Sequence, residues 1–452
     1  MSGDMAAPKT RLPSERWQSF DDWNYGGMRQ RLEGFMASIN KTALTEHASV
    51  VLSSPASMSE PFSAGQYWCC FELVVPDGRF LIARARLPKH PGDSATDADE
   101  EYLIQCEVAT MKFLRANVRT VPVPELYAYE APGSAWAIKA GATYMLIEGF
   151  YGNSLQDIDH SIYNLSVGLT LLPPFYRHSS NPLEVSTQEH IFAQWTSFQA
   201  ELAAFTFPQI GSISQFSTDT GPVIGTIASS SIDGLPAAGP FHSGWEYFVA
   251  VAEGLVAHAL ERKRSGTESN QFAILGPLVF RNIVRDTEIF KSSQGPFHFN
   301  HMDMGIQNIL VDDDFNFVAV IDWELAQTAP WEVNHYPMPI PLISSDKEIA
   351  EILYDPGHKA HRNMSRQVGA RLLYRQKFKE AERALEKRGN TLHCSIAEVL
   401  DGKASRIYGL VGKIGVFHGM EEELTNELVR LGYGLTGQEA ERHLQMLREE
   451  GQ

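Results

Sequence analysis

The chain has 452 residues, of which 43% are hydrophobic and 21% charged, and its formal net charge is -17. This composition is ordinary for a globular enzyme and supplies enough apolar side chains for large cores without disulfide or metal cross-links. The acidic balance argues against nucleic acid and anionic membranes as partners, because binding to either depends on Lys and Arg neutralising phosphates.

The cysteines and the absence of long apolar segments indicate the compartment. The four cysteines contain no CxxC pair, so we expect neither a zinc site nor a disulfide framework. Residues 1–17 lack the apolar core of a signal peptide, and no apolar run approaches the ~20 residues that span a bilayer. We therefore expect a reduced, cytoplasmic protein.

The first predicted elements are a helix and a β-hairpin. Residues 17–39 have apolar side chains at helical spacing. Residues 68–75 are rich in aromatic and β-branched side chains, and residues 80–85 return after an Asp77-Gly78 turn. This pattern predicts two antiparallel strands.

A second helix and two further strands complete the predicted sheet region. Residues 101–116 have a helical apolar stripe with Glu107 beside it, and the prolines at 122 and 124 end the helix. Residues 127–129 and 143–147 are then expected to form strands. The result is a small sheet with one crossing helix.

The rest of the chain is expected to be mainly helical. Ser186 and Glu189 form a capping-box pattern that opens a helix. The other expected segments are irregular structure with short helices over 151–182, a long loop or hairpin over 210–240, helices over 244–263 and 273–289, and charged amphipathic helices over 345–450.

The segment 297–331 contains the residues that indicate chemistry. We expect strands at 309–311 and 315–321, joined by an acidic turn. An antiparallel hairpin brings its two ends together, so Asn308 and Asp322 should lie side by side. An amide oxygen and a carboxylate oxygen on a rigid hairpin suit a hard divalent cation.

This segment resembles the aminoglycoside phosphotransferase and choline kinase-like family, most closely its fungal members. The resemblance rests on the spacing His301-x-Asp303-x-x-x-x-Asn308 and on Asp322 in an Ile-Asp-Trp-Glu sequence. Weaker matches occur in the same order along roughly residues 60–335, at residues 107–111, 121–124, 207–212 and 239–241.

The resemblance implies an α+β, bilobal protein-kinase-like fold, with a small antiparallel-sheet N-lobe and a larger, mainly helical C-lobe. The implied division is an N-terminal helical extension at 1–50, the N-lobe at 51–149, the C-lobe with catalytic loop and metal site at 150–345, and a helical region completing the C-lobe at 346–452.

The catalytic loop would act on ATP and Mg²⁺. Asp303 would accept the proton of the acceptor hydroxyl, and His301 would fix the loop's conformation. Asn308 and Asp322 would hold the metal on the phosphates. Phosphoryl transfer leaves little covalent work to the protein, so positioning and charge stabilisation account for most of the catalysis.

Four N-lobe residues would bind the nucleotide. Arg84 stands where the fold usually has a phosphate-binding lysine, and Glu107 would pair with it. Gly65 is the one glycine near the expected phosphate-covering loop, and Glu148 would begin the hinge whose backbone meets adenine. Arginine for lysine is a real departure, since a guanidinium is forked and bulky.

The expected reaction is transfer of the γ-phosphoryl group of ATP to a hydroxyl of a small molecule. One alternative is a kinase-fold protein that binds without catalysing, which Arg84 and the isolated Gly65 favour. A protein kinase is the other alternative, but Glu324 replaces the glycine of the Asp-Phe-Gly motif and no Ala-Pro-Glu signal occurs. The acceptor and the oligomeric state stay open.

Overall fold

The computed structural model describes residues 11–15, 28–89, 96–120, 122–158, 185–228, 238–337, 346–416 and 418–450. The chain divides into two compact units. Unit 1 comprises 1–158, 215–222 and 307–323, and unit 2 comprises 159–214, 223–306 and 324–452. Unit 1 contains an antiparallel sheet and unit 2 is mainly helical, which confirms the α+β class. The predictions for residues 17–27 and 159–182 lie outside the described residues.

Unit 1 is organised around a five-stranded sheet in which every neighbouring pair is antiparallel. Its strands, in spatial order, are β1 (Ser57–Ala64), β2 (Trp68–Val74), β3 (Phe80–Arg86), β5 (Tyr144–Glu148) and β4 (Leu126–Glu130). The predicted hairpin is β2–β3, and Gly78 adopts the positive φ of 87° that its turn requires. Strand β1 was not predicted, because its Ser- and Pro-rich sequence lacks a strand signature.

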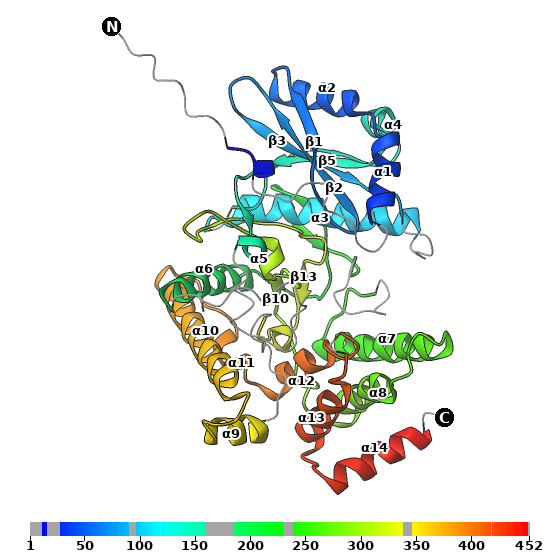
Figure 1. Ribbon diagram of the computed structural model, residues 1–452, viewed down its shortest axis with the longest axis vertical. Helices are drawn as coiled ribbons and strands as arrows, with labels where there is room; N and C mark the ends of the chain where they lie inside the picture. The colour runs from blue at the N-terminus through cyan, green and yellow to red at the C-terminus, as the bar shows by residue number, and fades with distance from the viewer. Residues whose placement is uncertain are drawn as a thin grey trace. The chain divides into compact units, whose positions relative to one another are not determined.

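Alternation along the strands gives the sheet two different faces. Cys69, Phe71 and Leu73 of β2 pack into a core with α1 (Met28–Ser38) and α2 (Lys41–Leu52). Trp68 lies on the other face, where it packs against α3 (Asp97–Asn117). Figure 1 shows α2 and α3 on opposite sides of the sheet.

Helices within residues 28–52 form part of the core of unit 1, and most of these residues lie in the segment 1–50 that is expected to be a helical extension. Helices α1 and α2 are separated at Asn40, whose side chain caps α2 by accepting a hydrogen bond from the Ala43 backbone at 3.2 Å. Leu32 and Leu44 are completely buried against the sheet. The short helix α4 (Ala135–Ala140) contributes to the same core.

A second, three-stranded sheet in unit 1 carries the predicted metal-binding hairpin. Its order is β12 (Phe317–Val320), β11 (Ile309–Val311) and β6 (Asn153–Ser154), and α5 (Leu155–Ile158) follows β6. The sequence-based division placed 150–345 in one lobe. By its contacts, the segment 307–323 groups with unit 1, and the lobe boundaries expected from the sequence stay predictions.

A large hydrophobic core in unit 2 is formed by helices from distant parts of the chain. Unit 2 also has a small sheet of β13 (Gln327–Ala329), β10 (Phe297–Asn300) and β7 (Thr206–Phe207). Strand β10 directly precedes the predicted catalytic loop. The described helices of unit 2 are α6 (Val185–Ala203), α7 (Gly244–Arg264), α8 (Gln271–Asp286), α9 (Asp346–Tyr354), α10 (His361–Lys387), α11 (Ile396–Val399), α12 (Lys403–Val411), α13 (Glu421–Tyr433) and α14 (Gln438–Glu450).

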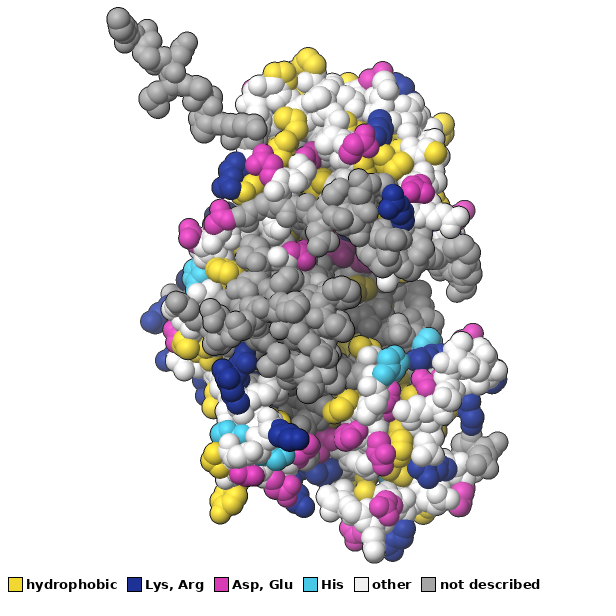
Figure 2. Space-filling view, in the orientation of Figure 1, with side chains coloured by type: hydrophobic (Ala, Val, Ile, Leu, Met, Phe, Trp, Pro, Cys, Tyr) yellow, Lys and Arg dark blue, Asp and Glu magenta, His cyan; other side chains and the backbone are white. Residues whose placement is uncertain are grey.

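The remaining described elements are short. A hairpin of β8 (Ile213–Ser217) and β9 (Gly221–Ile224) lies within the segment expected to be a long loop or a hairpin, and there are 3₁₀ turns at Pro13–Glu15, Ile306–Asn308 and Trp331–Val333. On the face in Figure 2, acidic and basic side chains are interspersed over the helical unit. In the part of the chain that the structure describes, no helix has the length and apolarity needed to cross a membrane.

Truncating a core residue of α1 tests whether this helix stabilises unit 1. Leu32 is completely buried, so Leu32→Ala should cost about 2–5 kcal/mol of unfolding free energy through lost burial and a residual cavity. The measurement is the urea midpoint followed by tryptophan fluorescence. Leu372→Ala is the matched control, because Leu372 is 62% exposed and should change stability by less than about 0.5 kcal/mol. Equal midpoints for the two variants would show that α1 contributes nothing.

Candidate functional site

Arg84 connects three segments of unit 1 through one guanidinium group. Its Nη1 donates to Oε1 of Glu107 on α3, and its Nη2 donates to Oδ1 of Asp322 at 2.7 Å. The group also lies over the ring of Trp68, 4.5 Å from the centroid. Arg84 and Trp68 share the α3 face of the sheet because they occupy positions of the same parity in paired strands.

The Arg84–Glu107 ion pair predicted from the sequence is therefore present, and it is almost fully enclosed. The Glu107 side chain has no exposed surface and that of Arg84 is 12% exposed. Burial raises the pKa of Glu107, while Arg84 and a hydrogen bond from the Trp323 backbone oppose that rise. A forked guanidinium can reach two carboxylates at once, which explains why an arginine suits this position better than a lysine. The roles of both residues in nucleotide binding stay predictions.

Removing the carboxylate of this pair should destabilise unit 1. Glu107→Ala leaves the Arg84 charge enclosed with half of its partners, which should cost about 3–5 kcal/mol of unfolding free energy. Glu33→Ala is the matched control, because Glu33 forms an exposed i,i+4 pair with Arg29 on α1 and such pairs contribute about 0.3–0.5 kcal/mol. Denaturant titration of both variants measures the difference. A Glu107→Ala midpoint equal to that of the control would contradict the structural role.

Asn308 and Asp322 stand at the two ends of the β11–β12 hairpin. Ile309 pairs with Val320, and the Ile321 N–H donates to the Asn308 carbonyl at 3.0 Å. Asp322 directly follows Ile321, so the two predicted ligands lie at the same end of the hairpin. Asn308 is buried, whereas the Asp322 side chain is 34% exposed. Asp322 has a φ of 66°, a left-handed conformation that is strained for a residue with a side chain.

These two side chains fit a divalent cation that a nucleotide brings with it. Their oxygens are the hard donors that Mg²⁺ prefers, and Mg²⁺ commonly takes one or two protein ligands together with phosphate oxygens. Among the described residues, no group of three or more His, Cys, Asp or Glu side chains is gathered that could hold a metal by itself. One amide oxygen and one carboxylate oxygen are a donor set that a metal–phosphate complex can use.

The loop predicted to carry the catalytic base belongs to unit 2 and follows β10. His301 is fully buried, and Asp303 is half-buried. Met302 between them has a φ of 65°, and its N–H donates to Oδ1 of Asn300 at 3.1 Å. The Gly305 N–H donates to the Asp303 carbonyl at 2.8 Å. The backbone around Asp303 is thus fixed by local hydrogen bonds, while the roles of Asp303 and His301 stay predictions.

A buried histidine that the sequence analysis missed supports this loop. Nε2 of His298 accepts from the side-chain amides of Asn300 at 3.3 Å and Asn334 at 3.1 Å, and its ring stacks on Trp331. Burial lowers the pKa of His298 to about 4, so the ring is neutral and can accept. Alternation along β10 places His298 on the face opposite Phe297 and Phe299, and both faces are buried, so the burial of His298 had no signal in the sequence.

The low pKa of His298 makes unit 2 sensitive to acid. In the unfolded chain His298 takes up a proton as the pH falls below about 6.5. In the folded chain it stays neutral until the pH falls to about 4. Stability is therefore fully present above pH 6.5 and is lost as pH falls through that interval, by roughly 3 kcal/mol in total. Denaturant midpoints measured from pH 7 to about pH 4 should fall less steeply for His298→Gln than for wild type.

The control for this pH series is a histidine outside the core. His358 is exposed on the segment between α9 and α10, so His358→Gln should follow the wild-type profile. Identical profiles for wild type and His298→Gln would contradict the burial of a neutral ring.

The other two predicted residues occupy turns of unit 1. Glu148 ends β5, where its carboxylate accepts from the Glu125 N–H at 3.1 Å and pairs with Arg115 at 3.2 Å. Gly65 lies in the β1–β2 turn, where its N–H donates to the Trp68 carbonyl at 3.0 Å and open space surrounds its α-carbon. The side chain of Glu148 is thus already used by the structure. Hinge and phosphate contacts by Glu148 and Gly65 stay predictions.

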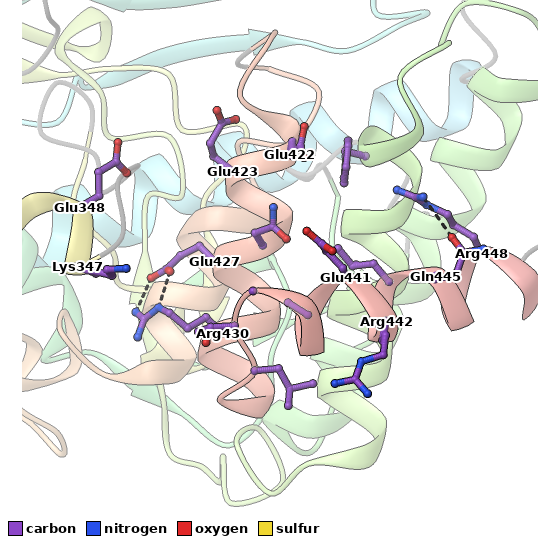
Figure 3. A pocket seen from close by; sticks show the side chains of 17 residues that line it. Lys347, Glu348, Glu422, Glu423, Glu427, Arg430, Glu441, Arg442, Gln445 and Arg448 are labelled. Carbon is purple, nitrogen blue, oxygen red and sulfur yellow. Dashed lines mark hydrogen bonds and ion pairs between the residues drawn. The ribbon is translucent and has the colours of Figure 1, made fainter.

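A cavity of about 740 Å³ in unit 2 lies apart from all of these residues. Helices α8, α9, α13 and α14 surround it, and Figure 3 shows acidic and basic side chains facing it together, including the Glu427–Arg430 ion pair. Its lining has five acidic side chains and four basic ones. None of the predicted site residues lines it.

No protein-family model matches the chain, and no curated protein is similar enough to count as a relative. Among solved structures, a thermostable aminoglycoside phosphotransferase mutant in a ternary complex with AMP-PNP and hygromycin B is 14% identical, with TM-score 0.40 and coverage of 87% of this chain and 100% of that one. A macrolide 2'-phosphotransferase from Brachybacterium faecium is 14% identical, with TM-score 0.36 and coverage of 88% and 99%.

An ethanolamine kinase from Plasmodium vivax is 10% identical, with TM-score 0.35 and coverage of 88% of this chain and 82% of that one. The fungal affinity expected from the sequence stays a prediction. Because the TM-scores lie below 0.5, we base the functional proposal on the residues of this chain alone.

Proposed function

We propose that the protein is a phosphotransferase that moves the γ-phosphoryl group of ATP, bound with Mg²⁺, to a hydroxyl of a small molecule. The observation that carries this proposal is the Arg84 bridge. A cation on β3 is held by Glu107 of α3 and points its second N–H at Asp322, the residue expected to hold the metal. The cluster of Glu107, Arg84 and Asp322 would thus hold a positive charge for the phosphates next to a ligand for the metal.

Local strain supports the same assignment. Of the described residues, four non-glycine residues have positive φ, and two of them are Met302 beside the expected base and Asp322 at the expected metal site. Such conformations cost roughly 1–3 kcal/mol each and persist where the surrounding structure enforces them, frequently at functional sites. The Asn300 hydrogen bond enforces the first, and the Arg84 ion pair accompanies the second.

In the proposed reaction the acceptor hydroxyl attacks the γ-phosphorus, and the bond from that phosphorus to the ADP oxygen breaks. The hydroxyl proton passes to a carboxylate oxygen of Asp303. Arg84 stabilises the negative charge on the nucleotide phosphates, and Glu107 keeps its guanidinium in place. Mg²⁺, when bound through Asn308 and Asp322, would neutralise charge on the β- and γ-phosphates.

Two substitutions separate binding from catalysis. Asp322→Asn should abolish the part of the ATP-induced rise in melting temperature that requires Mg²⁺, because it removes an anionic ligand. Asp303→Asn should keep that rise and lower phosphoryl transfer by roughly 10²–10⁴-fold, because it removes the base. ATP consumption across a library of hydroxyl-bearing metabolites supplies the rate.

The matched control is Asp314→Asn, which changes an exposed aspartate in the turn of the same hairpin. It should behave as wild type in both measurements. Wild-type turnover by Asp303→Asn would remove Asp303 from the role of base.

One observation favours the non-catalytic alternative. Arg84 already occupies Oδ1 of Asp322, so in this conformation a cation and the guanidinium compete for one carboxylate. A protein that binds without catalysing would retain this pair. A wild-type melting temperature that millimolar ATP with Mg²⁺ leaves unchanged would select this alternative.

A further inference from the structure

A short segment, residues 11–15, is held against the large sheet of unit 1 and is called the strap below. It includes a 3₁₀ turn whose Pro13 is buried. The Ser14 N–H donates to Oε1 of Glu72 at 2.5 Å, and the Ser14 hydroxyl donates to Oε2 at 2.7 Å. Figure 1 shows the turn, in dark blue, beside the sheet. Both oxygens of one carboxylate on β2 thus bind the strap.

The Glu72 carboxylate is enclosed in this arrangement. Glu72 is 1% exposed, and an enclosed carboxylate requires donors close to its oxygens. Ser14 supplies a donor to each oxygen, and hydrogen bonds to an ionised acceptor are the stronger kind. These two bonds make Ser14 the anchor of the strap.

The position of Glu72 places the strap on the face of the sheet that carries Arg84. In the register of β2 and β3, Glu72 lies opposite Ile82 and Cys70 lies opposite Arg84. Residues two apart in a strand share a face, so Glu72 and Arg84 are diagonal neighbours on one face. Such neighbours are roughly 7–8 Å apart.

A nucleotide bound as proposed would cross the same face. Its phosphates would lie at Arg84 and its base at the residues from Glu148 onward. Ile82 lies between these two points, because it follows Arg84 by two positions on that face and pairs with Ile147 of β5. Glu72 is the neighbour of Ile82 on the β2 side. The strap is therefore anchored on the path that the nucleotide would take.

The other end of the strap contacts two further segments of unit 1. The guanidinium group of Arg11 lies over the ring of Tyr151, 4.0 Å from the centroid. It also forms an ion pair of 3.5 Å with Asp313, in the turn of the β11–β12 hairpin. The strap thus extends from this turn and from the segment after β5 to β2.

Few contacts hold the strap, so it can leave while the sheet stays folded. Pro13 is buried and Leu12 half-buried, whereas Arg11, Ser14 and Glu15 are exposed. The Arg11–Asp313 pair is exposed as well, and such pairs contribute little to stability. Segments with few buried apolar contacts open locally at low free energy.

We propose that the strap is an autoinhibitory contact that occupies the nucleotide-binding face of unit 1 and leaves Glu72 before ATP binds. This inference rests on the proposed function, which puts ATP on that face. The apparent dissociation constant for ATP then equals the intrinsic one divided by the fraction of molecules whose strap is undocked. A strap docked in about nine-tenths of the molecules weakens ATP binding about tenfold.

Isothermal titration calorimetry of the full chain with ATP and Mg²⁺ tests the competition. Ser14→Glu puts a second carboxylate against Glu72 and repels the strap from the sheet. This variant should bind ATP more tightly than wild type, about tenfold for the docked fraction given above. Ser14→Ala removes the hydroxyl donor alone and should tighten binding by less. Equal dissociation constants for wild type and Ser14→Glu would overturn the proposal.

The matched control is Ser57→Glu, which adds the same charge at an exposed position of β1 in the same sheet. An added negative charge by itself repels ATP, so this control should leave the affinity unchanged or weaken it. Tighter binding by Ser14→Glu is thus opposite to the general effect of charge. Equal tightening by Ser57→Glu would remove the strap as the cause.

Hydrogen exchange of the full chain reports on the strap directly. The Ser14 amide should exchange slowly in wild type and fast in Ser14→Glu, and neither result involves a nucleotide. Saturating ATP with Mg²⁺ should then speed exchange over residues 11–15 of wild type. Fast exchange of the wild-type Ser14 amide without ligand would overturn the docking.

The two measurements together separate failure of the strap from failure of the proposed function. ATP that binds while residues 11–15 stay protected would overturn the strap and leave the phosphotransferase proposal intact. If neither wild type nor Ser14→Glu binds ATP, the proposed function fails and the autoinhibitory role falls with it.

Discussion

One guanidinium group joins three segments of unit 1 that are far apart in the sequence. Arg84 lies on a central strand, Glu107 on the helix that crosses one face of the sheet, and Asp322 at the end of a hairpin over two hundred residues later. Because the Glu107 side chain is completely enclosed, its charge is tolerable only while the arginine is present. The sheet, the helix and the hairpin must therefore keep their mutual positions for this cluster to exist.

Much of unit 1 could be predicted from local patterns, and the exceptions have physical causes. The β2–β3 hairpin follows from β-branched and aromatic residues around Asp77-Gly78, where the turn chemistry is local. Strand β1 could not be read, because Ser57–Ala64 forms a strand only by pairing with β2 at the sheet edge. The membership of α1 in the core also depends on tertiary packing, which an amphipathic pattern alone does not assign to a partner.

The candidate site also has some features that could be predicted from the sequence and others that could not. The adjacency of Asn308 and Asp322 follows from hairpin geometry, and the Arg84–Glu107 pair follows from strand and helix periodicity once the fold is expected. The reach of Arg84 to Asp322 was not predictable, since it depends on two separate sheets meeting within unit 1. The hydrogen bonds from Met302 to Asn300 and from Asn300 to His298 could not be predicted either. Met302 has a left-handed backbone conformation, and such a conformation has no sequence signature in residues other than glycine and asparagine.

The motif from His301 to Asp322 is continuous in sequence, yet its two halves are held by different units. His298 and Asn300 of unit 2 fix the backbone on which Asp303 stands, through hydrogen bonds that require a neutral, buried imidazole. Arg84 of unit 1 fixes the carboxylate of Asp322. Each half is thus held in place by the fold itself, and the ordering costs of positioning the proposed base and the proposed metal ligand are met during folding. If Asp322 holds a metal as proposed, an approaching cation meets a carboxylate that Arg84 already engages. Phosphates that attract the guanidinium would release that carboxylate, so nucleotide and cation should bind more strongly together than separately.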